Sequence, residues 1–445
     1  MEHKHQNTTI FAVSSGKLPS GVAIIRISGP LSLYCLSKLS GKSISKPKAL
    51  ELRNLYYPYS KKLIDQCMVV WFQKPNSFTG EDVVELHCHG SIAVIEAVTK
   101  ILSEINFVRI AEPGEFTKIA FFNQKLNMDQ VEGLADLINS ETTMQLAQAH
   151  NFLRGDLGKL SNNIRESLIG ILSKLEAFIE FEDEGVSLES LENINLEITN
   201  NINHIKKLVN NYENGRAIRE GFVVAIVGAP NVGKSSIINR IANNDVAIVT
   251  NEPGTTRDIV EVKINLYGFP IYIQDTAGIR SSNNKIEKLG IEKTIDSINN
   301  ADLILYVSDS SSSENDQDIL DKLSGKNYLQ INNKSDVVKY PEDQEGILLS
   351  AETGEGFDNL FESLKNIIID KTSINSDSFL MLARQRHYDI FRDILNSLDN
   401  FLKQDIIELK ADDLSFAIRL LGKITGRVDL DHMLDKLFSE FCIGK

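Results

Sequence analysis

The chain of 445 residues has few cysteines and no long apolar run, and both facts limit the kinds of protein it can be. Its four cysteines, Cys35, Cys67, Cys88 and Cys442, form no Cys-x-x-Cys pair, which fits a reducing compartment and no disulfide framework. No apolar run approaches the roughly 20 residues that a bilayer-spanning helix needs. Residues 1–9 lack the apolar centre of a signal peptide and the arginines of a transit peptide. We therefore predict a cytoplasmic protein with no membrane span.

Positive charge is also scarce. The chain has 47 Lys and Arg against 61 Asp and Glu, a formal net charge of -14 and a pI of about 5.2. A dedicated nucleic-acid-binding protein usually shows a basic footprint, so any contact with RNA has to use a local patch or arrive through a partner. Hydrophobic residues make up 42% of the chain, enough for real cores, and its length predicts two to four domains.

The first 120 or so residues mix strand and helix patterns. Apolar and β-branched runs predict strands at 21–27, 67–72 and 83–89, and helical spacing covers 92–105. A helix between strand-like segments is typical of a small α+β domain.

Helical periodicity dominates both sides of a central α/β segment. Apolar residues recur at three- and four-residue steps between Leu153 and Phe178, which predicts one long helix, and a second helical stretch covers 188–212. The helical pattern returns after Ser376. Between these stretches, from about 221 to 370, short apolar strands alternate with helices, the rhythm of a mostly parallel sheet.

The predicted fold is therefore multidomain, with an α+β domain first and an α/β domain inserted into a helical domain. The expected boundaries are 1–119 for the N-terminal domain, 120–216 and 373–445 for the two helical halves, and 217–372 for the inserted domain.

A phosphate-binding loop opens the inserted domain. The sequence GAPNVGKS at 228–235 matches the pattern G-x-x-x-x-G-K-S, follows the strand FVVAIV and precedes a helical run. Its glycines let backbone N–H groups point at a phosphate, and the helix N-terminus adds partial positive charge. Lys234 is expected to reach the outer phosphates, and the Ser235 hydroxyl to hold Mg²⁺. The predicted nucleotide contacts here are Asn231, Val232, Gly233, Lys234, Ser235 and Ser236.

Two further motifs belong to the phosphate side of the same site. Thr255 and Thr256 lie in a polar loop, where a threonine hydroxyl can bind Mg²⁺ and sense the γ-phosphate. The strand IYIQ ends in Asp275, which is expected beyond the direct Mg²⁺ ligands. Its motif continues through Thr276, Ala277 and Gly278, whose backbone N–H can meet the γ-phosphate.

The base side of the site follows two later strands. Asn333, Lys334 and Asp336 form an N-K-x-D motif after NYLQIN. The Asp336 carboxylate can accept hydrogen bonds from the N1–H and exocyclic amine of guanine, and adenine has no donors at those positions. Ser350 and Ala351 follow ILL, where a backbone contact to the guanine oxygen is expected. The ordered motifs predict a GTP site, with Mg²⁺ at Ser235 and Thr256.

The residues alone do not identify the group that activates water. Ile279 follows the D-T-A-G motif where many small GTPases have a glutamine, and an aliphatic side chain cannot orient water. Arg280, Glu287 and Glu292 are the candidates downstream. Glu287 can equally be a solvated acid at the start of a helix.

The whole chain resembles the MnmE (TrmE) family of tRNA modification GTPases. The resemblance rests on GEDVVELHCHG at 80–90, AEPGEFTKIAFFNQKLN at 111–127, the inserted GTPase domain and the terminal FCIGK at 441–445. It implies an N-terminal domain that mediates homodimerisation and binds 5,10-methylenetetrahydrofolate, with 5-formyltetrahydrofolate as a binding analogue. The implied folate contacts are Arg26, Glu85, Lys125 and Lys445. Cationic side chains suit the glutamate carboxylates of a folate, and a carboxylate suits the donors of its pterin ring.

The resemblance also implies how GTP is hydrolysed. Two inserted domains are expected to meet around K⁺, which would neutralise charge between the phosphates. The catalytic glutamate of the family falls on Glu287. The implied K⁺ contacts, some through backbone carbonyls, are Asn231, Thr250, Glu252 and Thr255, and Thr250 is counted with the nucleotide contacts.

The implied partners are a second copy of the chain and the FAD-dependent MnmG protein, in a heterotetramer. Together they would build an aminomethyl or carboxymethylaminomethyl group onto C5 of the tRNA wobble uridine. FAD would enter only through the partner, which could supply much of the RNA surface. The alternative function is a pure binding switch, such as a ribosome-assembly GTPase, although the flanking segments show no GXXG-type RNA clamp.

Overall fold

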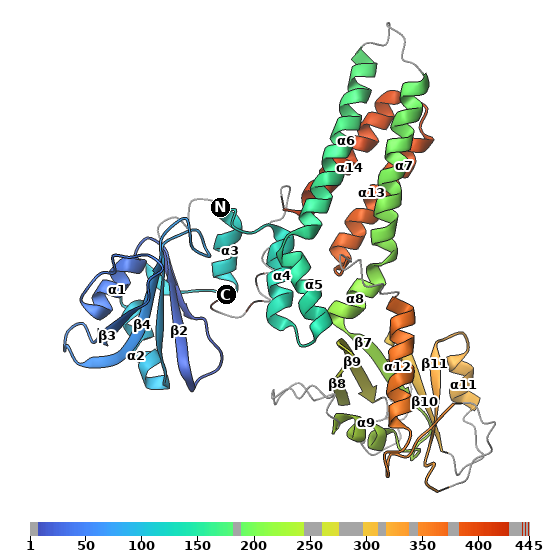
Figure 1. Ribbon diagram of the computed structural model, residues 1–445, viewed down its shortest axis with the longest axis horizontal. Helices are drawn as coiled ribbons and strands as arrows, with labels where there is room; N and C mark the ends of the chain where they lie inside the picture. The colour runs from blue at the N-terminus through green and yellow to red at the C-terminus, as the bar shows by residue number, and fades with distance from the viewer. Residues whose placement is uncertain are drawn as a thin grey trace, which may run out of the picture. The chain divides into compact units, whose positions relative to one another are not determined.

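The computed structural model divides the chain into two compact units. One consists of Met1–Ala135, Phe152–Asn163 and Leu421–Lys445, and the other of Asp136–Asn151 and Ile164–Leu420 (Figure 1). The structure describes residues 8–180, 188–243, 260–275, 297–309, 317–337, 346–372 and 382–426, together with Phe438, Phe441 and Gly444.

The N-terminal domain is built on a six-stranded sheet in the order β3-β4-β5-β2-β1-β6. Its strand pairs are antiparallel except for β1 and β6, which run parallel. The predicted strands at 21–27, 67–72 and 83–89 are confirmed, while β1, β3 and β6 carry weaker patterns and were not predicted. The strand bounds are Thr9–Val13 (β1), Ser20–Ser28 (β2), Glu51–Tyr56 (β3), Leu63–Phe72 (β4), Val83–Gly90 (β5) and Val108–Ile110 (β6).

The two faces of this sheet have different roles. One face packs Val84, Leu86 and Cys88 into a core with helices α1 (Ser32–Ser40) and α2 (Ile92–Ser103). The alternating side chains of a strand point to the opposite face, where Glu85 lies. There, helix α3 (Glu115–Phe122) contributes the fully buried Phe116 to a small second cluster.

The helical segments lie on both sides of the insert in the sequence. The long helix predicted from Leu153 to Phe178 starts too early, because Leu153 ends α5 and Gly155 adopts a left-handed φ of 71° before α6 begins at Asp156. Helices α7 and α13, from the two halves, pack side by side (Figure 1). The helix bounds are Met128–Asn139 (α4), Thr143–Leu153 (α5), Asp156–Glu180 (α6), Leu188–Asn210 (α7), Tyr212–Glu220 (α8), Gln385–Lys403 (α13) and Ile407–Ile424 (α14).

The inserted domain has a second six-stranded sheet, in the order β12-β11-β10-β7-β9-β8. All of its pairs are parallel except β8 with β9. The strands expected from the βα rhythm are confirmed at Phe222–Val227 (β7), Val260–Leu266 (β8), Phe269–Asp275 (β9), Leu303–Asp309 (β10), Tyr328–Asn333 (β11) and Ile347–Leu348 (β12).

Helices cover both faces of this mostly parallel sheet. Residues of α9 (Lys234–Ala242) and α12 (Phe357–Thr372) join one core cluster, and Leu323 of α11 (Gln317–Leu323) joins another. The central strands are accordingly continuous apolar runs. The loops after β7, β9, β10 and β11 all start at the carboxyl ends of these strands, because parallel strands end on the same side of the sheet. An open α/β sheet binds its ligands at these carboxyl ends.

In the part of the chain that the structure describes, no helix is long and apolar enough to cross a membrane.

Candidate functional sites

The phosphate loop connects β7 to α9 and depends on its last glycine. Gly233 has φ 99°, and a Cβ atom there would lie 2.2 Å from Asn333 Nδ2. Lys234 is 6% exposed, and its Nζ donates to the carbonyl oxygens of Gly228 and Ala229, each at 2.7 Å. A compact cation is thus held against the loop, at the N-terminus of a helix, where an anionic group is favoured.

The buried Asn333 side chain braces this loop against a neighbouring one. Its Nδ2 donates to Val232 O at 2.8 Å, and its Oδ1 accepts from Ala351 N–H at 3.1 Å. Val232 belongs to the phosphate loop, and Ala351 follows β12. The structure therefore brings three of the predicted contact residues together, with Asn333 as the link.

The base-side residues lie at the ends of β11 and β12. Asp336 is exposed, and its Oδ1 accepts a hydrogen bond from Ser350 Oγ at 2.5 Å. Thr353 N–H donates to the same Ser350 oxygen at 3.1 Å. Ser335 Oγ is buried and has no hydrogen-bond partner among the described residues. The Asp336 carboxylate is thus fixed at one oxygen and remains accessible to hydrogen-bond donors.

Two supporting contacts were missed by sequence reasoning, which gave no role to Asp309 or Arg240. Lys334 has φ 66°, and its Nζ pairs with Asp309 Oδ2 at 2.5 Å. Arg240 of α9 donates to the carbonyl oxygens of Ala351, Glu352 and Thr353 at 3.0, 2.8 and 2.7 Å. Both contacts join segments that are distant in the sequence, so no local motif predicts them. They hold the base-side loops against the rest of the domain.

The structure describes only some of the remaining predicted nucleotide and metal residues. Asn231 has φ 65° in the loop, Ser235 and Ser236 lie in the first turn of α9, and the backbone of Asp275 ends β9 opposite Ile226 of β7. No group of three or more His, Cys, Asp or Glu suited to a metal occurs among the described residues. Thr250, Glu252, Thr255, Thr256, Thr276, Ala277, Gly278, Glu287 and Lys445 lie outside them.

An ion pair occupies the second face of the N-terminal sheet. Arg26 and Glu85 are direct partners on β2 and β5, and Arg26 Nε donates to Glu85 Oε1 at 2.8 Å. The guanidinium lies 5.6 and 5.7 Å from the ring centroids of Phe78 and Phe116. Glu85 Oε2 is 3.5 Å from His87 Nε2, which is buried without a hydrogen-bond partner in the described part of the chain. Arg26 thus orients Glu85, a role that its cationic character alone did not reveal.

Two other segments approach this face. Lys125 Nζ donates to Pro75 O at 3.0 Å, in the loop that also carries Phe78. Ser14 Oγ donates to Gly444 O at 2.8 Å, just after β1, whose Ala12 is the pairing partner of Arg26. Gly444, the residue before Lys445, is therefore anchored at the end of β1, which pairs with the strand that carries Arg26.

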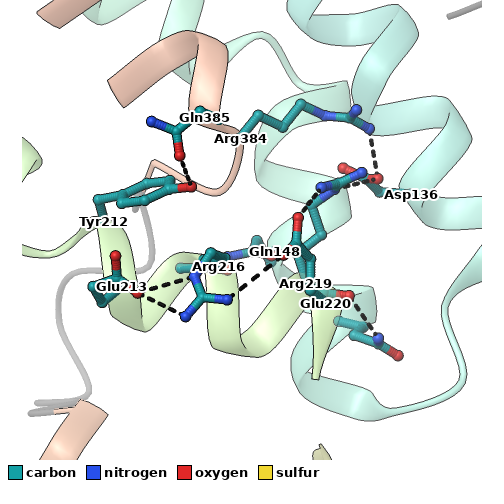
Figure 2. Close-up of polar contacts among 11 residues, drawn as sticks. Asp136, Gln148, Tyr212, Glu213, Arg216, Arg219, Glu220, Arg384 and Gln385 are labelled. Carbon is teal, nitrogen blue, oxygen red and sulfur yellow. Dashed lines mark hydrogen bonds and ion pairs between the residues drawn. The ribbon is translucent and has the colours of Figure 1, made fainter. Parts of the chain in front are cut away.

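One carboxylate links the inserted domain to the helices around it. Asp136 Oδ1, on α4, accepts from Arg219 Nε at 3.1 Å and from Arg384 Nη2 at 2.7 Å (Figure 2). Arg219 lies in the last turn of α8, directly before β7, and Arg384 directly precedes α13. Both points at which the chain passes between the helices and the inserted domain are therefore held by one side chain.

Neighbouring hydrogen bonds reinforce this junction. Gln145 and Gln148 of α5 donate from Nε2 to the carbonyl oxygens of Arg219 and Gly215, both at 3.1 Å. Tyr212 Oη donates to Gln385 Oε1 at 2.9 Å (Figure 2). We name Asp136, Arg219 and Arg384 the junction triad. It was not predicted, because its members are far apart in the sequence.

Two family models match the chain. The model described as MnmE helical domain matches residues 128–442, and the one described as GTP-binding protein TrmE N-terminus matches residues 9–125. The relative named tRNA modification GTPase MnmE from Rickettsia akari (strain Hartford) is 39% identical over 445 residues, covering 98% of this chain and 100% of the relative. The protein of the same name from Pelagibacter ubique (strain HTCC1062) is 40% identical over 461 residues, with the same coverage.

Solved structures match the chain only in part. The G domain of the T. maritima FeoB iron transporter is 26% identical, with a TM-score of 0.25, and covers 34% of this chain and 97% of its own. Aquifex aeolicus Era is 24% identical, with a TM-score of 0.26, and covers 42% and 69%. At these low TM-scores the fold assignment rests on the strand order and on the family models.

Replacing Asp136 tests the junction triad. In Asp136→Ala the two guanidinium groups, 23% and 11% exposed, lose their shared carboxylate, so we expect the free energy of unfolding to fall by roughly 2 kcal/mol. Thermal or denaturant unfolding measures this. The matched control is Glu213→Ala, which removes the exposed partner of Arg216 on α8 and should have an effect within about 0.5 kcal/mol. Equal stabilities of the two variants would contradict the role of the triad.

Proposed function

Because this chain belongs to the MnmE family of tRNA modification GTPases, we propose that it hydrolyses GTP at the sheet edge where the phosphate loop meets the Asn333–Ala351 contact. The observation that carries this proposal is the brace from Asn333 to Val232 and Ala351, which joins the phosphate side to the base side. A parallel sheet with helices on both faces and its loops at one edge suits a nucleotide. The pure binding switch has no observation of its own in its favour.

The residues at this edge fit a guanine nucleotide and Mg²⁺. Lys234, held at the loop mouth, would bind the outer phosphates together with backbone N–H groups of 231–236. Ser235 and Thr256 would hold Mg²⁺, which supplies positive charge to the phosphate oxygens, with Asp275 nearby. The Asp336 carboxylate, oriented by Ser350, would accept the guanine donors, with Asn333, Lys334 and Ala351 completing the base side.

Hydrolysis requires more than these groups, since Ile279 cannot orient water. We assign water activation to Glu287. The set Asn231, Thr250, Glu252 and Thr255 would hold K⁺ when two inserted domains meet, and Thr276, Ala277 and Gly278 would contact the γ-phosphate. This assignment rests on family membership and on the position of Asn231 within the phosphate loop.

The second face of the N-terminal sheet suits a one-carbon tetrahydrofolate. Glu85 is held by Arg26, whose guanidinium lies near the rings of Phe78 and Phe116, and offers an oriented acceptor for the pterin donors. His87 Nε2 offers a buried polar group without a hydrogen-bond partner in the described residues. Lys125 and Lys445 supply positive charge for the glutamate tail. The cofactor would be 5,10-methylenetetrahydrofolate.

The proposed assembly is a homodimer that joins an FAD-dependent MnmG partner in a heterotetramer. Its substrate is tRNA, modified at C5 of the wobble uridine. Family membership supports this assembly.

Changing the base-recognising carboxylate tests the GTP assignment. In Asp336→Asn an amide replaces one acceptor facing guanine. Affinity for GTP should therefore fall roughly 10- to 100-fold, and affinity for xanthosine triphosphate should rise. Calorimetric Kd values for both nucleotides measure this. The control Asp358→Asn alters an exposed carboxylate of α12 in the same domain and should leave both Kd values unchanged. An unaltered preference for GTP in Asp336→Asn would refute the proposed base contact.

A second prediction concerns water activation and the monovalent cation. Glu287→Ala should lower the hydrolysis rate roughly 100-fold or more with nearly unchanged GTP affinity, because a general base acts in the transition state. Wild-type turnover should also be faster in K⁺ than in Na⁺ at equal ionic strength. Glu292→Ala is the matched control. If Glu287→Ala hydrolysed GTP as fast as the wild-type chain, Glu287 would not be the activating group. Equal rates in K⁺ and Na⁺ would refute the K⁺ site.

A third prediction concerns the folate face. The wild-type chain should bind 5-formyltetrahydrofolate in calorimetry, and Glu85→Gln should weaken binding roughly 10-fold or more, because a charged acceptor is lost. Glu96→Gln, on the exposed side of α2, is the control and should bind normally. Absence of binding by the folded wild-type chain would count against the folate assignment.

A further inference from the structure

The N-terminal sheet carries a local concentration of positive charge that no function described above uses. Residues 38–62 contain seven Lys or Arg and a single acidic residue, Glu51, in a chain whose formal net charge is -14. This segment contains β3, the edge strand of the sheet. Six of its lysines are exposed, and together they are named the basic edge: Lys38, Lys42, Lys46, Lys48, Lys61 and Lys62.

The basic edge extends along the whole length of β3. Lys46 and Lys48 precede the strand, and Lys48 N–H donates to Trp71 O, near the end of β4, at 2.7 Å. Lys61 and Lys62 lie at the opposite end, in the turn from β3 to β4, which is closed by two 3.0 Å backbone hydrogen bonds between Tyr57 and residues 61 and 62. A six-residue strand at about 3.3 Å per residue separates the two ends by roughly 20 Å.

These lysines are available to an external anion. None of the six makes an ion pair in the part of the chain that the structure describes, whereas Arg53, within β3, pairs with Glu51. Exposed lysines on an otherwise acidic protein attract polyanions, and phosphodiester backbones are neutralised by such groups.

Aromatic side chains accompany the charge. Tyr59 is 96% exposed and Tyr57 is 41% exposed, both at the hairpin tip beside Lys61 and Lys62. Proteins that read single-stranded RNA loops stack unpaired bases on such rings while cationic side chains hold the backbone.

We propose that the basic edge binds the phosphodiester backbone of tRNA, with Tyr59 stacking on an unpaired base. This inference rests on the proposed function, because it takes tRNA as the substrate. A second copy of the chain is the competing occupant, since Leu50, Leu52 and Leu63 are also exposed here. Antiparallel pairing of two β3 edges, however, would bring the lysines at 46 and 48 of one copy against those at 61 and 62 of the other. Like charges brought together in this way disfavour self-association.

The test measures binding of an unmodified tRNA transcript to the full chain by fluorescence anisotropy across a series of salt concentrations. The double variant Lys61→Ala with Lys62→Ala should weaken binding roughly 10-fold and reduce the slope of log K against log salt by about 1–2. Tyr59→Ala should weaken binding roughly 10-fold with an unchanged slope, because stacking releases no counterions. The double variant Lys46→Ala with Lys48→Ala, at the other end of β3, should reduce affinity and slope by similar amounts.

The matched control is Lys206→Ala with Lys207→Ala, which removes two exposed lysines from α7 and should change neither affinity nor slope. Equal affinities and slopes for all variants would overturn the proposal. A changed oligomeric state in sedimentation, with unchanged tRNA binding, would overturn it in favour of self-association. A wild-type chain that binds no tRNA would overturn it as well. GTP hydrolysis measured in the same preparations reports separately on the proposed function, because these variants lie in a different domain.

Discussion

A domain inserted into another must begin and end at nearly the same place, and here one carboxylate serves both ends. Asp136 accepts hydrogen bonds from Arg219, where the chain enters the inserted domain, and from Arg384, where it has returned (Figure 2). β7 begins three residues after Arg219 and leads directly to the phosphate loop. The junction triad therefore fixes the base of the strand that carries the nucleotide site.

At the other end of β7, the nucleotide site depends on side chains that join loops. Asn333 links the phosphate loop to the loop after β12, Arg240 holds that second loop by three carbonyl groups, and Lys334 pairs with Asp309. These contacts organise the site around strand ends that the parallel sheet already places together. Pre-organised polar groups of this kind cost no rearrangement when a ligand arrives.

The N-terminal domain separates its tasks by sheet face and edge. One face is an apolar core, the opposite face carries the Arg26–Glu85 pair beside the anchored Gly444, and the β3 edge carries lysines. An acidic chain thereby keeps a small cationic surface, in line with the expectation that RNA contact needs a local patch. Because the patch is short, the overall composition conceals it.

The sequence by itself determined the family, the strand and helix order of the insert, and the nucleotide motifs, because these are local patterns: strand and helix periodicity, and contiguous residues that shape one loop. Prediction failed where a local signal was weak, as at β1, β3, β6 and Gly155. Only the tertiary structure decided that Arg26 orients Glu85, that Asn333 braces two loops and that Asp136 joins Arg219 to Arg384. Each of these contacts lies between residues distant in the sequence, and chain folding alone brings such groups within hydrogen-bonding distance.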